Sequence, residues 1–117
     1  MHIPDEVGEF LKSYVYLYID PSNQEIFYIG KGIGNRIFSH LDDQSETDKV
    51  RRIAEIRKNG FEPKIELLRY GLSDAEAALV EAAAIDLIGK INLTNRISGF
   101  HSQSFGRISS KDIITML

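Results

Sequence analysis

The sequence predicts an α+β fold in which a small three-stranded antiparallel β-sheet is flanked by helices. The first two strand-like segments are joined by a short turn, so they form a hairpin and not the parallel βαβ unit of a nucleotide-binding sheet. The elements follow in the order β-β-α-β-α, which places helices around a small sheet. With 117 residues, 43% of them apolar and 26% charged, the chain is expected to form one soluble globular domain.

The first predicted strand is marked by strict alternation. Residues 4–12 before it are expected to form a short helix. In the segment SYVYLYID, the tyrosines at positions 14, 16 and 18 share one face, and Val15, Leu17 and Ile19 share the other. The aliphatic face is expected to point toward a core.

The second strand, residues 25–29, follows a turn over residues 20–23. A loop made of residues 21–23 would pair Asp20 with Gln24 and would place Tyr16 directly opposite Tyr28. A loop one residue shorter would put the two tyrosines on opposite faces. Tyrosines in a strand are also common as plain packing residues.

The remaining elements are predicted from helix starts, apolar positions and glycine stops. They are a helix start at 36–41, a helix from 45–48 to Gly60 with Val50, Ile53 and Ala54 on its apolar side, and a strand over 64–70. They continue with a helix from the Ser73/Glu76 capping box to Gly89, a loop over 92–103 and a helix over 108–117.

Composition restricts the location and the partners. The chain has no cysteine, which excludes disulfides and thiolate zinc sites. It has no apolar run long enough for a membrane span and no signal peptide, so we expect no membrane partner and a cytoplasmic location, nucleoid-associated in a bacterium. The net charge of −3 argues against a generic polyanion binder, although residues 31–69 hold nine basic and seven acidic side chains. This basic middle fits site-directed phosphate contact and, equally, an ordinary mixed surface.

The stretch FYIGKGIGNRIFSH, residues 27–40, carries three glycines around Lys31. It matches neither the phosphate-binding pattern GxxxxGK[ST] nor GxGxxG. Backbone amides and cations at a helix start nevertheless suggest a phosphate site, formed by Gly30, Lys31, Gly32, Asn35 and Arg36. His40 follows Arg36 by four positions and is expected on the same helix face. The alternative is a flexible turn followed by a solvated helix.

The helix over 73–89 is apolar nearly all round and is therefore expected to be largely buried, yet it has Glu81 at its centre. A buried carboxylate needs a partner, either a hard cation such as Mg²⁺ or an ion pair to Arg36; the remaining alternative is that Glu81 lies at the rim of the buried face. Tyr16 and Tyr28 could lose a proton beside a cation. Together these groups are the ones that phosphodiester hydrolysis requires.

These residues resemble a known family. Tyr14-Val15-Tyr16 followed by Tyr28-Ile29-Gly30 is similar to the two halves of the GIY-YIG endonuclease signature, with Tyr14 in place of the first glycine. Further matches are Asn35-Arg36, His40, Glu81 within Ala-Leu-Val-Glu, and Leu93-Thr94-Asn95 with Gly99. The Gly-Lys-Gly-Ile-Gly-Asn-Arg loop and the Leu-Thr-Asn ending resemble most the C-terminal nuclease domain of animal LEM-domain, ankyrin-repeat proteins and its bacterial relatives.

The resemblance implies a three-stranded antiparallel sheet with helices and divalent-metal-dependent cleavage of DNA. It divides the chain into an N-terminal helical extension (1–12), a GIY-YIG-like nuclease domain (13–100) and a C-terminal loop and helix (101–117). Because the last predicted helix stops abruptly, we expect a truncated chain or a larger parent protein.

The resemblance also implies a role for each matching residue. Tyr16 is the preferred general base for the attacking water, and Tyr28 supports it or contacts the phosphate. Lys31 and His40 lower the pKa of the tyrosines or relay the proton, and Arg36 binds the scissile phosphate. Glu81 holds one Mg²⁺ or Mn²⁺ ion. Asn95 orients the site, with Asn92 as a rival.

The expected partner is DNA, with branched or distorted DNA, as met in DNA repair, as the preferred substrate. Because the chain is acidic overall, we also expect an additional domain or protein that delivers the DNA. Arg51 and Arg52 could line the duplex or could belong to a solvated helix face. Two alternatives stay open: a domain of the same fold that binds DNA or protein without cutting, and an unrelated α+β interaction domain. The oligomeric state is also open.

Overall fold

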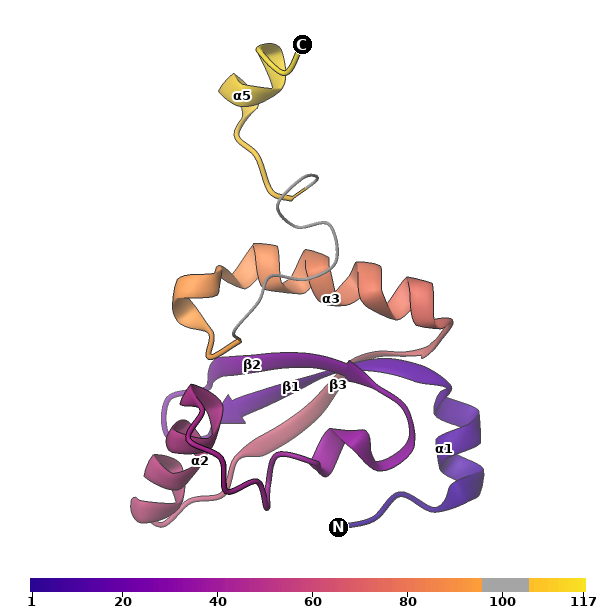
Figure 1. Cartoon of the computed structure of the whole chain (residues 1–117), viewed down its shortest axis with the longest axis vertical. Helices are drawn as coiled ribbons and strands as arrows, with labels where there is room; N and C mark the ends of the chain where they lie inside the picture. The colour runs from indigo at the N-terminus through magenta and orange to yellow at the C-terminus, as the bar shows by residue number, and fades with distance from the viewer. Residues whose placement is uncertain (96–105) are drawn as a thin grey trace.

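The sheet has three antiparallel strands in the order β2-β1-β3 (Figure 1). The strands are β1 (Ser13–Asp20), β2 (Glu25–Gly32) and β3 (Lys64–Leu72). This computed structural model describes residues 1–95 and 106–117. The predicted fold class, a small antiparallel sheet flanked by helices, is confirmed.

Helices cover both faces of the sheet (Figure 1). The face that carries the β1 tyrosines packs against α1 (Asp5–Leu11), the 3-10 turn η1 (Gly34–Phe38) and α2 (Asp48–Lys58). The aliphatic face packs against α3 (Asp74–Ile88). Because β1 is the central strand and is covered on both sides, all its residues from Tyr14 to Asp20 are buried. The aliphatic face was predicted to point toward a core; the tyrosine face forms a second core.

The hairpin register differs from the predicted one. Asp20 pairs with Glu25, and a bulge follows between Tyr18 and Ile19, so Tyr16 lies opposite Gly30 and Tyr18 lies opposite Tyr28. The direct pairing of Tyr16 with Tyr28 was therefore wrong. The loop is one residue longer than predicted because Gln24 adopts a left-handed conformation (φ 61°), and the bulge adds one more. Since the register moves by two residues in total, Tyr16 and Tyr28 still share one face.

The helix boundaries are close to those predicted for two of the long helices. The capping box of α3 is present, with Ser73 and Glu76 each bonding the other's backbone. The start of α2 has no side-chain cap, because Thr47 occupies the N-cap position without a side-chain hydrogen bond. In α2 the buried residues are Ile53 and Ile56, whereas Ala54 is exposed. The predicted helix over 36–41 is only the single turn η1, followed by a hydrogen-bonded turn.

The helix α3 was predicted to be largely buried, and this was wrong. Only Ala77, Ala82 and Ile85 are buried, whereas Leu79 is 66% and Leu87 71% exposed. The helix lies on the sheet with one face, and the large apolar side chains on its other side are exposed. The last helix, α5, spans Ser110–Ile114, within the predicted range 108–117, and has no buried residue.

A few sequence-based expectations lie outside the described residues. They concern Gly99, most of the loop over 92–103 and the domain boundary at residue 100. None of the described helices is long and apolar enough to cross a membrane.

Candidate active site

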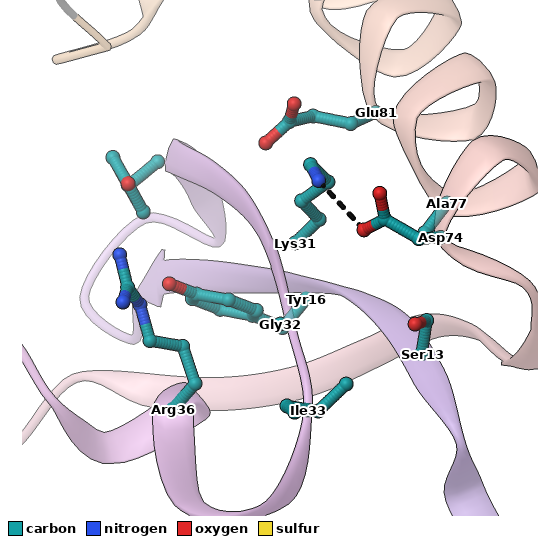
Figure 2. Close-up of a pocket in the computed structure, with 10 residues that line it drawn as sticks. Ser13, Tyr16, Lys31, Gly32, Ile33, Arg36, Asp74, Ala77 and Glu81 are labelled. Atoms are coloured by element: carbon teal, nitrogen blue, oxygen red, sulfur yellow. Dashed lines mark hydrogen bonds and ion pairs between the residues drawn. The ribbon is translucent and has the colours of Figure 1, made fainter.

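A cavity of about 410 Å³ opens beside the edge strand β2, where residues of β1, β2, η1 and α3 meet (Figure 2). Its walls hold five of the predicted functional side chains: Tyr16, Tyr28, Lys31, Arg36 and Glu81. The remaining wall residues are Ser13, Gly32, Ile33, Asp74 and Ala77. The fold therefore gathers five predicted functional residues, up to 65 positions apart in the chain, into one pocket.

Tyr16 reaches this pocket by passing over the edge strand. It lies opposite Gly30 in the sheet, and a Cβ atom on Gly30 would lie only 2.6 Å from the Tyr16 hydroxyl oxygen. Any side chain at position 30 would displace the phenol. Gly30 was predicted to offer backbone amides to a phosphate; its role in the structure is to leave room for the Tyr16 ring.

The side chain of Arg36 packs against Gly32 in a similar way. A Cβ atom on Gly32 would lie 2.6 Å from Cγ and 2.7 Å from Cβ of Arg36, so the arginine side chain lies against a bare backbone. Gly34, with φ 52°, then starts η1 in the left-handed region that favours glycine. Figure 2 shows the guanidinium group on the same side of the pocket as the Tyr16 hydroxyl.

Tyr16, Tyr28 and His40 form a contiguous aromatic cluster. The Tyr16 and Tyr28 ring centroids are 6.1 Å apart, and those of Tyr28 and His40 are 5.0 Å apart. The Tyr16 hydroxyl lies 3.3 Å from His40 Nε2. Burial is the main cause that raises the pKa of Tyr16 well above its ordinary value of 10.0, and burial also raises the pKa of Tyr28. Both phenols are therefore protonated at neutral pH.

His40 is kept neutral at the same pH. Burial lowers its pKa from 6.5 to about 4, and the nearby charges of Lys49 and Arg36 add to this shift. A neutral imidazole has one nitrogen that can accept a proton. His40 follows η1 in a turn, so it reaches Tyr16 through that turn and not through a helix face shared with Arg36.

Glu81 forms the opposite wall, on α3 (Figure 2). Burial raises the pKa of its carboxyl, and the charge and the backbone N–H of Lys31 oppose this shift. The Nζ atom of Lys31 donates to Asp74 Oδ1 at 2.9 Å, so Lys31 lies between two carboxylates of the same helix. Among the described residues no ion pair joins Glu81 to Arg36, the alternative that the sequence left open.

The surroundings of Glu81 fit a divalent cation that binds together with a phosphate. Within residues 1–95 and 106–117, no group of three or more His, Cys, Asp or Glu side chains could enclose a metal. Mg²⁺ does not need such a group, because it is commonly held by one or two carboxylates plus water and phosphate oxygens. The raised pKa of Glu81 reflects the cost of burying its charge, which a cation would offset.

Asn95 orients the strand that carries Tyr28. Its side-chain amide donates to the Ile29 carbonyl oxygen at 2.6 Å, and its Oδ1 accepts the Ile29 N–H at 3.1 Å. Thr94 bonds the Phe27 carbonyl through its backbone N–H and its hydroxyl. Among the described residues, the side chain of Asn92, the rival, bonds the end of α3 at the Ile88 carbonyl and not β2. Of the two asparagines, Asn95 is therefore the one in contact with β2.

Besides Gly30, three predicted phosphate- or DNA-binding residues do not line the pocket. The Asn35 side chain forms two hydrogen bonds with the main chain of Ile3: its Oδ1 accepts from the Ile3 N–H at 2.6 Å, and its Nδ2 donates to the Ile3 carbonyl at 3.2 Å. Arg51 is exposed and pairs with Asp48 in the first turn of α2. Arg52 pairs with Asp20 and Glu25 and lies over the Phe27 ring.

Two residues close to the site were missed from the sequence. Asp74 lies seven positions before Glu81, two helical turns away on the same face, and this spacing could have identified it. Lys49 places its Nζ 4.9 Å from the Tyr28 ring centroid, a cation–π contact. No local signal marks Lys49, because its approach depends on how α2 packs against the sheet.

Comparison with known proteins places these residues in a family context. The family model described as the LEM-3-like GIY-YIG domain matches residues 13–116. A curated relative is the Ankyrin repeat and LEM domain-containing protein 1 homolog of Caenorhabditis elegans, which is 31% identical over 133 aligned positions. The match covers 90% of this chain and 19% of that protein, so the chain spans about a fifth of the relative's length. No solved structure matches.

Proposed function

The chain belongs to the family of LEM-3-like GIY-YIG domains, and we propose that it is a DNA endonuclease that hydrolyses phosphodiester bonds with the help of a divalent cation. The match agrees with the resemblance seen in the signature residues. The observation that carries the proposal is the meeting of Tyr16, Tyr28, Arg36 and Glu81 in one pocket. An unrelated interaction domain would have no reason to gather them there.

In this proposal Arg36 binds the scissile phosphate. Its guanidinium group can donate two parallel hydrogen bonds to phosphate oxygens and can stabilise the charge that develops on them. Glu81, on the other wall of the pocket, would hold the cation, which would supply stabilisation of the developing negative charge. The phosphate therefore lies between the β2 edge and α3, with Lys31 as a further cation at the pocket wall.

Tyr16 is the general base of the proposed reaction. His40 Nε2, 3.3 Å away, relays the phenol proton away from the site, and the phenolate takes a proton from the attacking water. The water oxygen forms a bond to phosphorus while the bond to the leaving oxygen breaks. Because burial keeps the phenol of Tyr16 protonated at neutral pH, we expect the rate to rise with pH above 7.

The substrate class in this proposal is branched or distorted DNA, delivered by another domain or protein. The need for delivery is supported by the net charge of −3 and by the ion pairs that already engage Arg51 and Arg52. The name of the relative refers to ankyrin repeats and a LEM domain, and the matched part is 19% of that protein. The acidic net charge, the engaged arginines and the small matched share of the relative all favour weak DNA affinity of this domain by itself.

A cleavage assay tests the proposal. Labelled duplex, nicked, flapped and four-way DNAs would be incubated with the protein and Mg²⁺, Mn²⁺ or EDTA. We expect cleavage with a metal, none with EDTA, and faster cleavage of the branched substrates. Absence of cleavage with every DNA and metal would contradict an endonuclease and would favour a module of the same fold that binds without cutting.

A further inference from the structure

The turn that carries Arg36 is closed by the hydroxyl group of a buried tyrosine. Tyr14 Oη donates to the Gly34 carbonyl oxygen at 2.6 Å and accepts the Ile37 N–H at 3.0 Å. These two backbone groups lie on either side of Arg36, at the first and fourth positions of η1. The Tyr14 side chain is fully buried, so its hydroxyl has no access to solvent.

A neighbouring tyrosine and the N-terminal segment hold the same turn at other points. Tyr18 Oη donates to the Ile37 carbonyl oxygen at 2.7 Å, and the backbone N–H of His40 also bonds this hydroxyl. On the outside of the turn, the Asn35 side chain is paired with the main chain of Ile3. The segment between Gly34 and His40 is therefore held on one side by tyrosine hydroxyls of the sheet and on the other by the N-terminal segment.

We propose that Tyr14 is a positioning residue that acts through Arg36, because its hydroxyl holds η1 where the guanidinium group faces the phosphate. The importance of Arg36 for cleavage rests on the proposed function. Tyr14 stands where the general GIY-YIG signature has glycine, which has no side chain to form these bonds.

Packing alone does not account for the hydroxyl. A phenylalanine ring would fill the same space, but it would leave the buried Ile37 N–H and the part-buried Gly34 carbonyl without this partner. Burial also raises the pKa of Tyr14, so the hydroxyl stays protonated and can donate and accept at once. The substitution Tyr14→Phe therefore tests the two hydrogen bonds while it leaves the apolar ring in place.

The first test measures the turn directly and needs no nuclease activity. Amide hydrogen exchange at Ile37 would be followed by NMR in the wild type, in Tyr14→Phe and in Tyr70→Phe, a control that removes an exposed hydroxyl on β3. We expect exchange at Ile37 to become about tenfold faster in Tyr14→Phe, as for the loss of one buried hydrogen bond, and to stay unchanged in Tyr70→Phe. Unchanged exchange in Tyr14→Phe would overturn the proposal.

The second test asks whether Tyr14 acts through Arg36. We expect Tyr14→Phe to lower kcat about tenfold with little change in KM, because misplacing a charged group by a fraction of an ångström has such an effect. In the Arg36→Ala background, the same substitution should lower the residual rate no further. Equal rate losses in both backgrounds would mean a general structural role and would overturn the proposal.

Two further results separate the possible failures. Should Tyr14→Phe unfold, Asn35→Ala loosens the same turn from its exposed side, and it should show the same dependence on Arg36. A wild-type protein that cleaves nothing would end the proposed function. The exchange rate at Ile37 would still decide whether the Tyr14 hydroxyl holds the turn.

Discussion

The phenol of Tyr16 lies across Gly30, so close that a methyl group on that glycine would be 2.6 Å from the tyrosine oxygen. Gly32 leaves the same kind of space for Arg36. The two glycines of the edge strand therefore set the positions of a phenol and a guanidinium group that come from different elements. This relationship explains the glycines at positions 30 and 32 of the stretch FYIGKGIGNRIFSH.

Substitution of Gly30 by alanine should push the phenol of Tyr16 out of its position in the pocket. The new methyl group must displace the buried Tyr16 ring, and we expect cleavage to fall at least about 100-fold, with a stability loss of about 1–3 kcal/mol. Gly8→Ala in α1 is the matched control, because its methyl group would be 3.6 Å from Gly34 Cα, an ordinary contact. The control should gain about 0.5–1 kcal/mol and keep its activity. Full activity of Gly30→Ala in a plasmid assay would contradict the role of this glycine.

Glu81→Gln should remove activity and stabilise the metal-free protein. Because the pKa of Glu81 is raised on folding, its charge lowers stability at neutral pH, and this effect vanishes below the ordinary pKa of 4.5. We expect a higher Tm for the variant than for the wild type at pH 7.5 and equal values near pH 4. Added Mg²⁺ should raise the Tm of the wild type only. A variant that is less stable than the wild type at pH 7.5, measured by thermal unfolding in EDTA, would argue against the raised pKa.

His40 should titrate far below an ordinary histidine. As its pKa is lowered from 6.5 to about 4, the unfolded chain takes up a proton first, and the folded state loses stability as the pH falls through this range. The free energy of unfolding of the wild type, relative to that of His40→Gln, should therefore fall steadily as the pH is lowered from 6.5 to 4. An NMR titration of the imidazole measures the pKa directly, with His40→Gln to assign the signal. A midpoint near 6.5 would show that the ring is solvated and not packed against Tyr28.

Arg51 and Arg52 are neighbours with different expected effects. Arg52 bonds the buried Asp20 at 3.3 Å and lies over Phe27, so Arg52→Ala should cost about 1–3 kcal/mol of stability. Arg51 forms an exposed pair, and Arg51→Ala should change stability by less than about 0.5 kcal/mol. Urea unfolding of both variants, beside their DNA affinities, separates a structural role from a DNA-binding one. Weaker DNA binding in both, without any loss of stability in Arg52→Ala, would favour the DNA-lining role.

Local patterns were enough to predict most of the fold. The alternation in β1, the turn after Asp20 and the Ser73/Glu76 capping box each depend on neighbours in sequence, and these elements were found where predicted. The hairpin register was missed because a bulge and the left-handed Gln24 leave no clear sequence signal. The exposure of α3 was missed because periodicity does not tell whether a second layer covers an apolar helix.

The sequence identified most residues of the candidate site, but it did not predict how those residues contact one another. Tyr16, Tyr28, Arg36 and Glu81 were named from their chemistry and from the family resemblance, and the fold brings them together. The reasons for the glycines were not foreseen, since the Tyr16–Gly30 and Arg36–Gly32 contacts depend on register and on the path of η1. The hydroxyl of Tyr14 was not foreseen either, because a tyrosine in a strand is usually a packing residue.

The most direct test of the central claim is nicking of supercoiled plasmid by the wild type and by Glu81→Gln, each with Mg²⁺, Mn²⁺ or EDTA. Asp86→Asn, which changes another acidic residue of α3 outside the pocket, is the matched control. We predict metal-dependent nicking by the wild type and by Asp86→Asn, and none by Glu81→Gln. Nicking by Glu81→Gln at the wild-type rate would contradict a catalytic centre in this pocket.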